Sequence, residues 1–168
     1  FKARGALHAL LHAPRGARHV ITASGGNHGA AVAWAAAQLG FRADIFVPVI
    51  AAPAKVEVLQ RFGARVHQVG ADYAASLAAS QEFSEGMTAV SVHAYDQHEV
   101  MCCACTVGLE LAEQVSGVDV VVVACGGGGL AGGIAAAIGE QADIVVVETS
   151  LTPAYAAAVS ACLLYTSP

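Results

Sequence analysis

A run of four consecutive glycines separates a β-branched stretch, Val120–Val123, from a stretch of small apolar residues that begins at Leu130. The four glycines are Gly126, Gly127, Gly128 and Gly129. Glycines between a strand and a helix expose successive backbone N–H groups beside the positive end of the helix dipole. The pattern therefore predicts a site for a phosphate group, held by backbone hydrogen bonds.

The same glycines allow two other interpretations. The segment Gly127–Gly132 satisfies the G-x-G-x-x-G pattern of dinucleotide-binding folds. Glu148 closes the next predicted strand, where an acidic residue binds the ribose of NAD. An NAD-dependent oxidoreductase with a Rossmann fold is therefore one alternative. Close packing of a helix on a strand, without any ligand, is the other.

Two further segments precede the glycines: Phe1-Lys2-Ala3-Arg4-Gly5 and Ser24-Gly25-Gly26-Asn27-His28-Gly29. Together with Gly126–Gly129 and Leu130, they resemble the Ser-Phe-Lys-x-Arg-Gly, Ser-x-Gly-Asn-His and Gly-Gly-Gly-Gly-Leu motifs of one family. This is the threonine/serine dehydratase family of pyridoxal-phosphate enzymes, also called fold type II. The resemblance runs from Phe1 to about Glu148. Three motifs in the same order are more specific than one, so we expect pyridoxal 5'-phosphate as the cofactor.

The resemblance implies a role for each cofactor-binding residue. A lysine amine must join the aldehyde of the cofactor, and the sequence contains two lysines, Lys2 and Lys55. Lys2 matches the family position; once substrate displaces it, its amine would remove the α-proton. Asn27 would donate a hydrogen bond to the 3-oxygen, and the Phe1 ring would pack beside the pyridine. The four glycines and Leu130 would hold the phosphate.

A second set of residues would bind the substrate. In the family this loop holds the substrate carboxylate through backbone N–H groups and a serine hydroxyl. The matching residues are Ser24, Gly25, Gly26, Asn27 and His28. The reaction implied is the deamination of L-threonine or L-serine by loss of the β-hydroxyl, which gives a 2-oxo acid and ammonia. Without the resemblance, Lys2 would be interpreted as an exposed lysine and the loop as an ordinary glycine turn.

The sequence departs from the family pattern at three places. Members that racemise serine have a second serine where this chain has Gly25, so racemisation is not expected. Members that bind a divalent metal have an aspartate where this chain has Ala154, so no metal is expected. The family sequence Gly-Gln-Gly-Thr is replaced by Cys103-Ala104-Cys105-Thr106. These cysteines would narrow the pocket, and they raise the alternative of a catalytically incomplete fragment.

Composition excludes several classes of protein. The net charge is −5 with eight basic residues, which leaves no basic stripe for nucleic acid. The mean hydropathy is +0.59, yet the longest charge-free run, Val120–Gly139, contains the four glycines and is not expected to span a membrane. Five cysteines in no paired spacing indicate a reducing compartment, so we expect a cytoplasmic protein.

The periodicity of the chain predicts an α/β fold with mainly parallel sheets flanked by helices. The expected strands are His19–Thr22, Ala43–Val47, Arg65–Val69, Ala89–Val92, Asp119–Ala124 and Asp143–Val147. The expected helices are Gly29–Leu39, Pro53–Phe62, Tyr73–Phe83, Val100–Val115 and Leu130–Ile138. Gly40, Gly63 and Gly139 are expected to end helices in left-handed conformation, and Asp72 is expected to cap one.

The resemblance also implies two lobes with the active site between them. Residues 15–92 would form the small substrate-binding lobe. Residues 1–14 and 93–161 would belong to the larger cofactor lobe, which is incomplete because the chain looks truncated at both ends. Residues 162–168 do not continue the family pattern and are expected to be a non-native tail. The expected partners are an amino-acid substrate and, at full length, a second copy of the chain in a homodimer.

Overall fold

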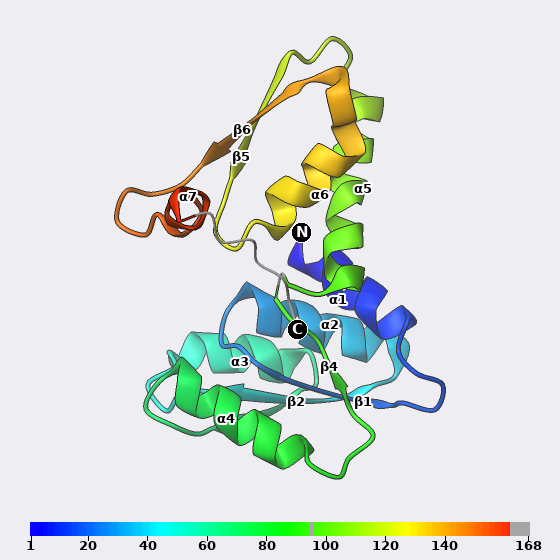
Figure 1. The fold of residues 1–168 in the computed structure, drawn as a ribbon. Coiled ribbons are helices and arrows are strands. Elements are labelled where there is room, and N and C mark those ends of the chain that lie inside the picture. The colour runs from blue at the N-terminus through cyan, green and yellow to red at the C-terminus, as the bar shows by residue number, and fades with distance from the viewer. Residues whose placement is uncertain (95, 162–168) are drawn as a thin grey trace. The chain divides into compact units, whose positions relative to one another are not determined.

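A computed structural model of the protein describes residues 1–94 and 96–161. They divide into two compact units (Figure 1). The N-terminal unit comprises residues 2–94, and the C-terminal unit comprises residues 96–161 together with Phe1. Each unit alternates strands with helices and has its own parallel sheet. The predicted α/β fold class is therefore confirmed.

The N-terminal unit is built around four parallel strands in the order β3-β2-β1-β4. Its elements are α1 (Lys2–Leu11), β1 (His19–Ala23), α2 (Asn27–Leu39), β2 (Arg42–Val47), α3 (Pro53–Arg61), β3 (Arg65–Gln68), α4 (Tyr73–Ser84) and β4 (Val90–Ser91). Helices α2 and α4 lie on opposite faces of the sheet (Figure 1). Parallel strands bury both faces, which explains the nearly continuous apolar sequences of β1 and β2.

The C-terminal unit is a β-α-β arrangement with helices before and after it. Its elements are α5 (His98–Gln114), β5 (Val120–Ala124), α6 (Gly129–Ile138), the 3-10 turn η1 (Gly139–Gln141), β6 (Asp143–Val147) and α7 (Ala154–Ser160). Strand β5 pairs in parallel with β6, with Val120 opposite Asp143. Val123, Ala131, Ile134 and Ile138 form its core.

Each predicted strand and helix occurs among the described residues, with ends shifted by no more than two residues. Gly40 ends α2 in left-handed conformation with φ +70°, and the carboxylate of Asp72 accepts the Ala75 N–H at 2.9 Å, as predicted. Gly139 ends α6 with a positive φ of +58°, but its ψ of −127° lies outside the left-handed helical region, so that prediction was wrong. Helices α1 and α7 were not among the predicted helices. The sequence shows no capping residue before α1, which begins at residue 2. The side chain that caps α7 is Glu148, six residues before the helix begins, and a local pattern does not reveal it.

The lobes proposed from the sequence remain a prediction. The structure groups residues 2–14 with residues 15–94, because α1 packs against α2, whereas the sequence assigned residues 1–14 to the larger lobe. The proposed tail, residues 162–168, lies outside the described residues. Within residues 1–94 and 96–161, no helix is long and apolar enough to cross a membrane.

Candidate active site

Lys2 is the first residue of α1, and its side chain is half-buried. Its Nζ donates a hydrogen bond to the carbonyl oxygen of Ala94, which follows β4. Burial lowers the pKa of Lys2 below its ordinary value, because the charged ammonium loses hydration. A larger share of this amine is therefore neutral at a given pH, as a Schiff-base lysine and proton acceptor requires.

The predicted substrate loop connects the end of β1 to the start of α2. The Ser24 N–H donates to the Phe46 carbonyl at 3.0 Å, which extends the pairing of β1 with β2 into the loop. The Gly26 N–H donates to Ser24 Oγ at 3.3 Å. Gly26 is the N-cap of α2, and as a glycine it provides no side-chain cap. Because Gly26 and Asn27 are exposed, the N-terminal end of α2 is accessible to an anion.

Gly29 lets this loop fold back onto the first turn of α2. A Cβ atom at this position would lie 2.0 Å from the carbonyl oxygen of Ser24 and 3.1 Å from its carbonyl carbon. No side chain fits there, so Gly29 fixes the path of the loop. In the sequence, Gly29 stands out only as the end of a motif.

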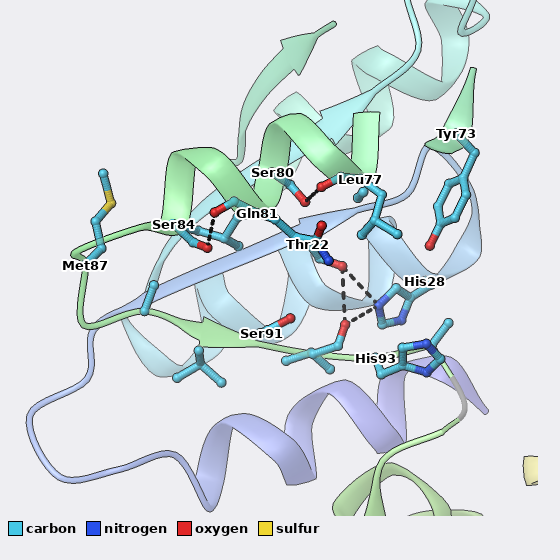
Figure 2. Close-up of a pocket in the computed structure, with 16 residues that line it drawn as sticks. Thr22, His28, Tyr73, Leu77, Ser80, Gln81, Ser84, Met87, Ser91 and His93 are labelled. Carbon is cyan, nitrogen blue, oxygen red and sulfur yellow. Dashed lines mark hydrogen bonds between the residues drawn. The ribbon is translucent and has the colours of Figure 1, made fainter. Parts of the chain in front are cut away.

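The imidazole of His28 points away from the exposed side of the loop, into the N-terminal unit. Its side chain is buried, and Nε2 lies 2.8 Å from the carbonyl oxygen of Val92. The hydroxyl of Thr22 lies 3.3 Å from the same nitrogen and donates to the same carbonyl at 3.3 Å. Figure 2 shows the three groups joined by dashed lines. Sequence reasoning missed Thr22, whose only signal is a hydroxyl within an apolar strand.

A pocket of about 260 Å³ lies beside this group, between α4, β1 and β4 (Figure 2). Polar side chains that face it include Thr22, His28, Ser80 and Gln81, and among the described residues no acidic or basic side chain other than histidine lines it. Burial lowers the pKa of His28 to about 4; the Val92 hydrogen bond opposes this effect, and the charges of Lys2 and His93 add to it. The His28 ring is therefore uncharged at neutral pH.

The tetraglycine lies in the C-terminal unit, between β5 and α6. Gly128 is the N-cap of α6 with φ +83°, a left-handed conformation that glycine adopts without strain, and as a glycine it provides no side-chain cap. A Cβ atom at Gly126 or Gly128 would meet no atom within 4 Å, so the loop borders open space. Leu130 packs against the core of this unit. These are the features of an anion-binding loop.

Helices α5 and α6 approach closely, and this contact positions the glycine loop. A Cβ at Gly133 would lie 2.5 Å from the Cβ of Ala104, and one at Gly108 would lie 2.8 Å from that of Ala137. Ala104 is buried in this contact, while the neighbouring Cys103 and Cys105 are only half-buried. In the segment Cys103–Thr106, the close contact with Gly133 therefore requires a small residue at Ala104.

Glu148 caps α7. Its Oε1 accepts the Tyr155 N–H at 2.6 Å, and its Oε2 accepts the Ala156 N–H at 2.8 Å. Both carboxylate oxygens thus bind backbone donors. This use of Glu148 weakens the alternative in which it binds the ribose of NAD.

The structure brings some of the predicted site residues together. Lys2 and residues 24–28 lie in the N-terminal unit, and the carbonyl groups of Val92 and Ala94 hold His28 and Lys2 there. Phe1, which is partly exposed, and Gly126–Gly129 belong to the C-terminal unit. The roles of these residues toward cofactor and substrate remain predictions.

Comparison with known proteins places this arrangement in a family. The sequence model of the family described as "Pyridoxal-phosphate dependent enzyme" matches residues 1–163. The L-threonine ammonia-lyase of Geobacter sulfurreducens is 39% identical over 158 residues, which cover 91% of this chain and 39% of that enzyme. The chain therefore spans about two fifths of the length of this curated relative.

Solved structures with a similar fold support the same family assignment. The processed form of threonine deaminase isoform 2 from Solanum lycopersicum has a TM-score of 0.91 at 26% identity, over 96% of this chain and 48% of that one. Maize serine racemase has a TM-score of 0.89 at 31% identity, over 99% of this chain and 52% of that one. These matches confirm the resemblance found in the sequence and favour pyridoxal phosphate over NAD. The chain belongs to the family of pyridoxal-phosphate-dependent enzymes.

Proposed function

We propose that this chain is the part of an ammonia-lyase that carries the catalytic lysine and the loops for cofactor and substrate. The reaction would convert L-threonine or L-serine into a 2-oxo acid and ammonia. One observation carries the proposal: a half-buried lysine amine of lowered pKa and the loop of residues 24–28 are held by one segment, Val92–Ala94. The similarity to proteins named threonine ammonia-lyase and threonine deaminase supports it.

The residues present fit pyridoxal phosphate. Its aldehyde requires an amine, and Lys2 supplies one whose pKa is lowered by burial. Its phosphate requires a cluster of backbone donors in open space, and the loop at Gly126–Gly129 ends at the N-terminus of α6, where the N-cap is a glycine. Asn27 would donate to the 3-oxygen, and the Phe1 ring would pack beside the pyridine.

Each residue would then have a distinct task in the reaction. Bound pyridoxal phosphate supplies an electron sink that acidifies the α-proton of the amino acid. Lys2 would hold the cofactor and, once exchanged for the amine of the substrate, accept the α-proton at Nζ. Ser24 Oγ and the backbone N–H groups at the start of α2 would bind the substrate carboxylate. The β-hydroxyl would leave as water, and hydrolysis of the dehydrated amino acid would release ammonia and the 2-oxo acid.

Two broader expectations complete the proposal. The four cysteines among the described residues form no disulfide, which supports a reducing compartment such as the cytoplasm. The complete enzyme is proposed to be a homodimer that acts on a free amino acid. Its molar mass in solution, measured by light scattering, tests the dimer.

Covalent trapping of the cofactor tests the role of Lys2. The protein is mixed with pyridoxal phosphate and reduced with borohydride, which fixes the cofactor on the amine that held it. After digestion, the added mass is located by mass spectrometry. We expect it on Lys2, and we expect Lys2→Ala to lose both the label and the release of 2-oxobutanoate from threonine.

Lys55 provides a matched control, because it is the other lysine of the chain and is exposed. Lys55→Ala should leave both label and activity unchanged. The proposal would be contradicted if the label were spread over Lys55 and the terminal amine without preference for Lys2.

A variant in the glycine loop, Gly128→Ala, should weaken cofactor binding, because alanine is strained at φ +83°.

A further inference from the structure

His28 is the one predicted substrate-loop residue whose side chain is buried, and its hydrogen bonds lead away from the exposed side of the loop. Its backbone belongs to the first turn of α2, close after the glycine N-cap. Its ring instead reaches the segment that follows β4. The imidazole therefore connects two chain segments that lie 64 residues apart.

The chemistry of the acceptor fixes the tautomer of this ring. A carbonyl oxygen only accepts hydrogen bonds, so His28 Nε2, at 2.8 Å from the Val92 oxygen, carries the proton and donates it. The Thr22 hydroxyl donates to the same oxygen at 3.3 Å. The carbonyl of Val92 thus binds two donors, one from β1 and one from the substrate loop.

Packing alone does not hold the ring in this position. His28 lines the pocket of about 260 Å³, so one side of the imidazole borders empty space (Figure 2). A side chain of similar size without the N–H could turn into this space. The hydrogen bond to Val92 is therefore the contact that sets the direction of the ring, and through it the start of α2.

The segment that receives His28 also receives Lys2. The Ala94 carbonyl accepts from Lys2 Nζ, two residues beyond the carbonyl that accepts from His28. We propose that His28 is a positioning residue, which ties the substrate loop through its Nε2–H to the Val92–Ala94 segment and so fixes the loop relative to the Lys2 amine. This inference rests on the proposed function for its effect on catalysis, but not for its effect on the loop.

The ring is suited to this task because its charge does not change near neutral pH. With a pKa of about 4, it keeps one proton on Nε2 and adds no positive charge beside Lys2. A second positive charge there would oppose the ammonium form of Lys2 and alter its protonation.

Amide hydrogen exchange tests the position of the loop without requiring activity. In His28→Leu, which removes the donor, we expect the amides of residues 25–29 to exchange about tenfold faster or more than in the parent protein. His28→Gln retains an N–H at a similar reach and should restore most of the protection. Thr22→Val, which removes the second donor, should give an intermediate increase. Ser80→Ala is the control, since its hydroxyl lines the same pocket but donates to Leu77 within its own helix.

Steady-state kinetics of the loaded enzyme test the consequence for catalysis. We expect His28→Leu to raise KM for threonine about tenfold and to lower kcat, and His28→Gln to recover most of both. Equal protection of residues 25–29 in His28→Leu and the parent would overturn the inference. So would a His28→Gln variant as impaired as His28→Leu, because the ring itself would then be required. Loss of protection in His28→Leu, without any deaminase activity of the complete parent enzyme, would uphold the inference and contradict the proposed function.

Discussion

The carboxylate of Asp44, in the N-terminal unit, accepts hydrogen bonds from three side chains. Its side chain is fully buried within β2. Its carboxylate accepts from His67 Nε2 at 2.6 Å, from His19 Nε2 at 2.7 Å and from Arg42 Nε at 2.9 Å. The Phe46 ring stacks on His67 with 4.4 Å between ring centroids. One buried carboxylate thus links β1, β2 and β3.

Asp44→Asn should destabilise the protein strongly. The substitution leaves the donors of His19, His67 and Arg42 without a charged acceptor, and breaking a buried pair of this kind costs about 3–5 kcal/mol. Urea unfolding should show a lower midpoint. Asp143→Asn, at an exposed position on β6, is the control and should change the midpoint little. A shift in Asp44→Asn no larger than in the control would contradict the role of the network.

The same carboxylate should make stability depend on pH. Burial alone would raise the pKa of Asp44, but the hydrogen bonds from His67, Arg42 and His19 outweigh it and hold the pKa below its ordinary value. The unfolded chain therefore binds this proton more tightly than the folded chain does. The stabilisation is complete above the unfolded pKa of about 4 and is lost as the pH falls through the folded pKa. Urea midpoints between pH 6 and pH 3 should fall more for the parent protein than for Asp44→Asn.

Gly25 should decide whether the enzyme racemises serine. The backbone does not require glycine there: φ is not positive, and an added Cβ would meet Val47 Cγ1 at 3.5 Å, an ordinary contact. Gly25→Ser should therefore fold, and its hydroxyl would supply the acid–base group that this loop lacks. We expect the parent to form no D-serine from L-serine and Gly25→Ser to form it at a low rate, measured by chiral chromatography. D-serine formation by the parent would contradict this assignment.

The contact between helices α5 and α6 depends on Gly133 but not on the adjacent Gly132. A Cβ at Gly133 would lie 2.8 Å from the carbonyl carbon of Ala104, while one at Gly132 would meet nothing within 4 Å. Gly133→Ala should therefore destabilise the protein by about 1–3 kcal/mol through overpacking. Gly132→Ala, in the same helix, should be neutral or stabilise by about 0.5–1 kcal/mol. Thermal unfolding of both variants checks this contrast, and equal shifts would contradict the close approach.

The two units differ in how completely helices cover the faces of their sheets. The sheet of the N-terminal unit has helices on both faces, and its central strands are buried. The C-terminal unit has two strands, whose outward face leaves Val122 67% and Val145 44% exposed. An isolated pair of strands is only marginally stable, so β5 and β6 depend on the packing of their other face against α6.

Hydrogen exchange of the 168-residue chain should therefore differ between the units. We expect amides of β1 and β2 to be protected at least about tenfold more strongly than those of β5 and β6, because opening the covered sheet exposes more apolar area. Mass spectrometry of peptic fragments measures both sets in one experiment. Equal or reversed protection would contradict the assignment of the more stable core to residues 2–94.

Several features of this protein follow from the sequence alone because their causes are local. The β-branched runs predicted the sheets, Asp72 and Gly40 marked helix ends, and three ordered motifs indicated the family and its cofactor. Each of these signals lies within a few residues of the structure that it predicts. Helix α7 was not predicted because the side chain that caps it, Glu148, lies six residues before the helix begins and not directly before it.

Tertiary structure decided the rest, because the partners come from distant parts of the chain. The parallel pairing of β1, β2 and β3 places His19 and His67 within reach of Asp44, each two residues along its strand from the direct partner of Asp44. The role of His28 depends on a backbone carbonyl, at Val92, which every residue possesses and no sequence pattern marks. The lowered pKa of Lys2 depends on its burial. The sequence thus determined which residues could do the chemistry, and the fold determined which of them are held, buried and kept uncharged.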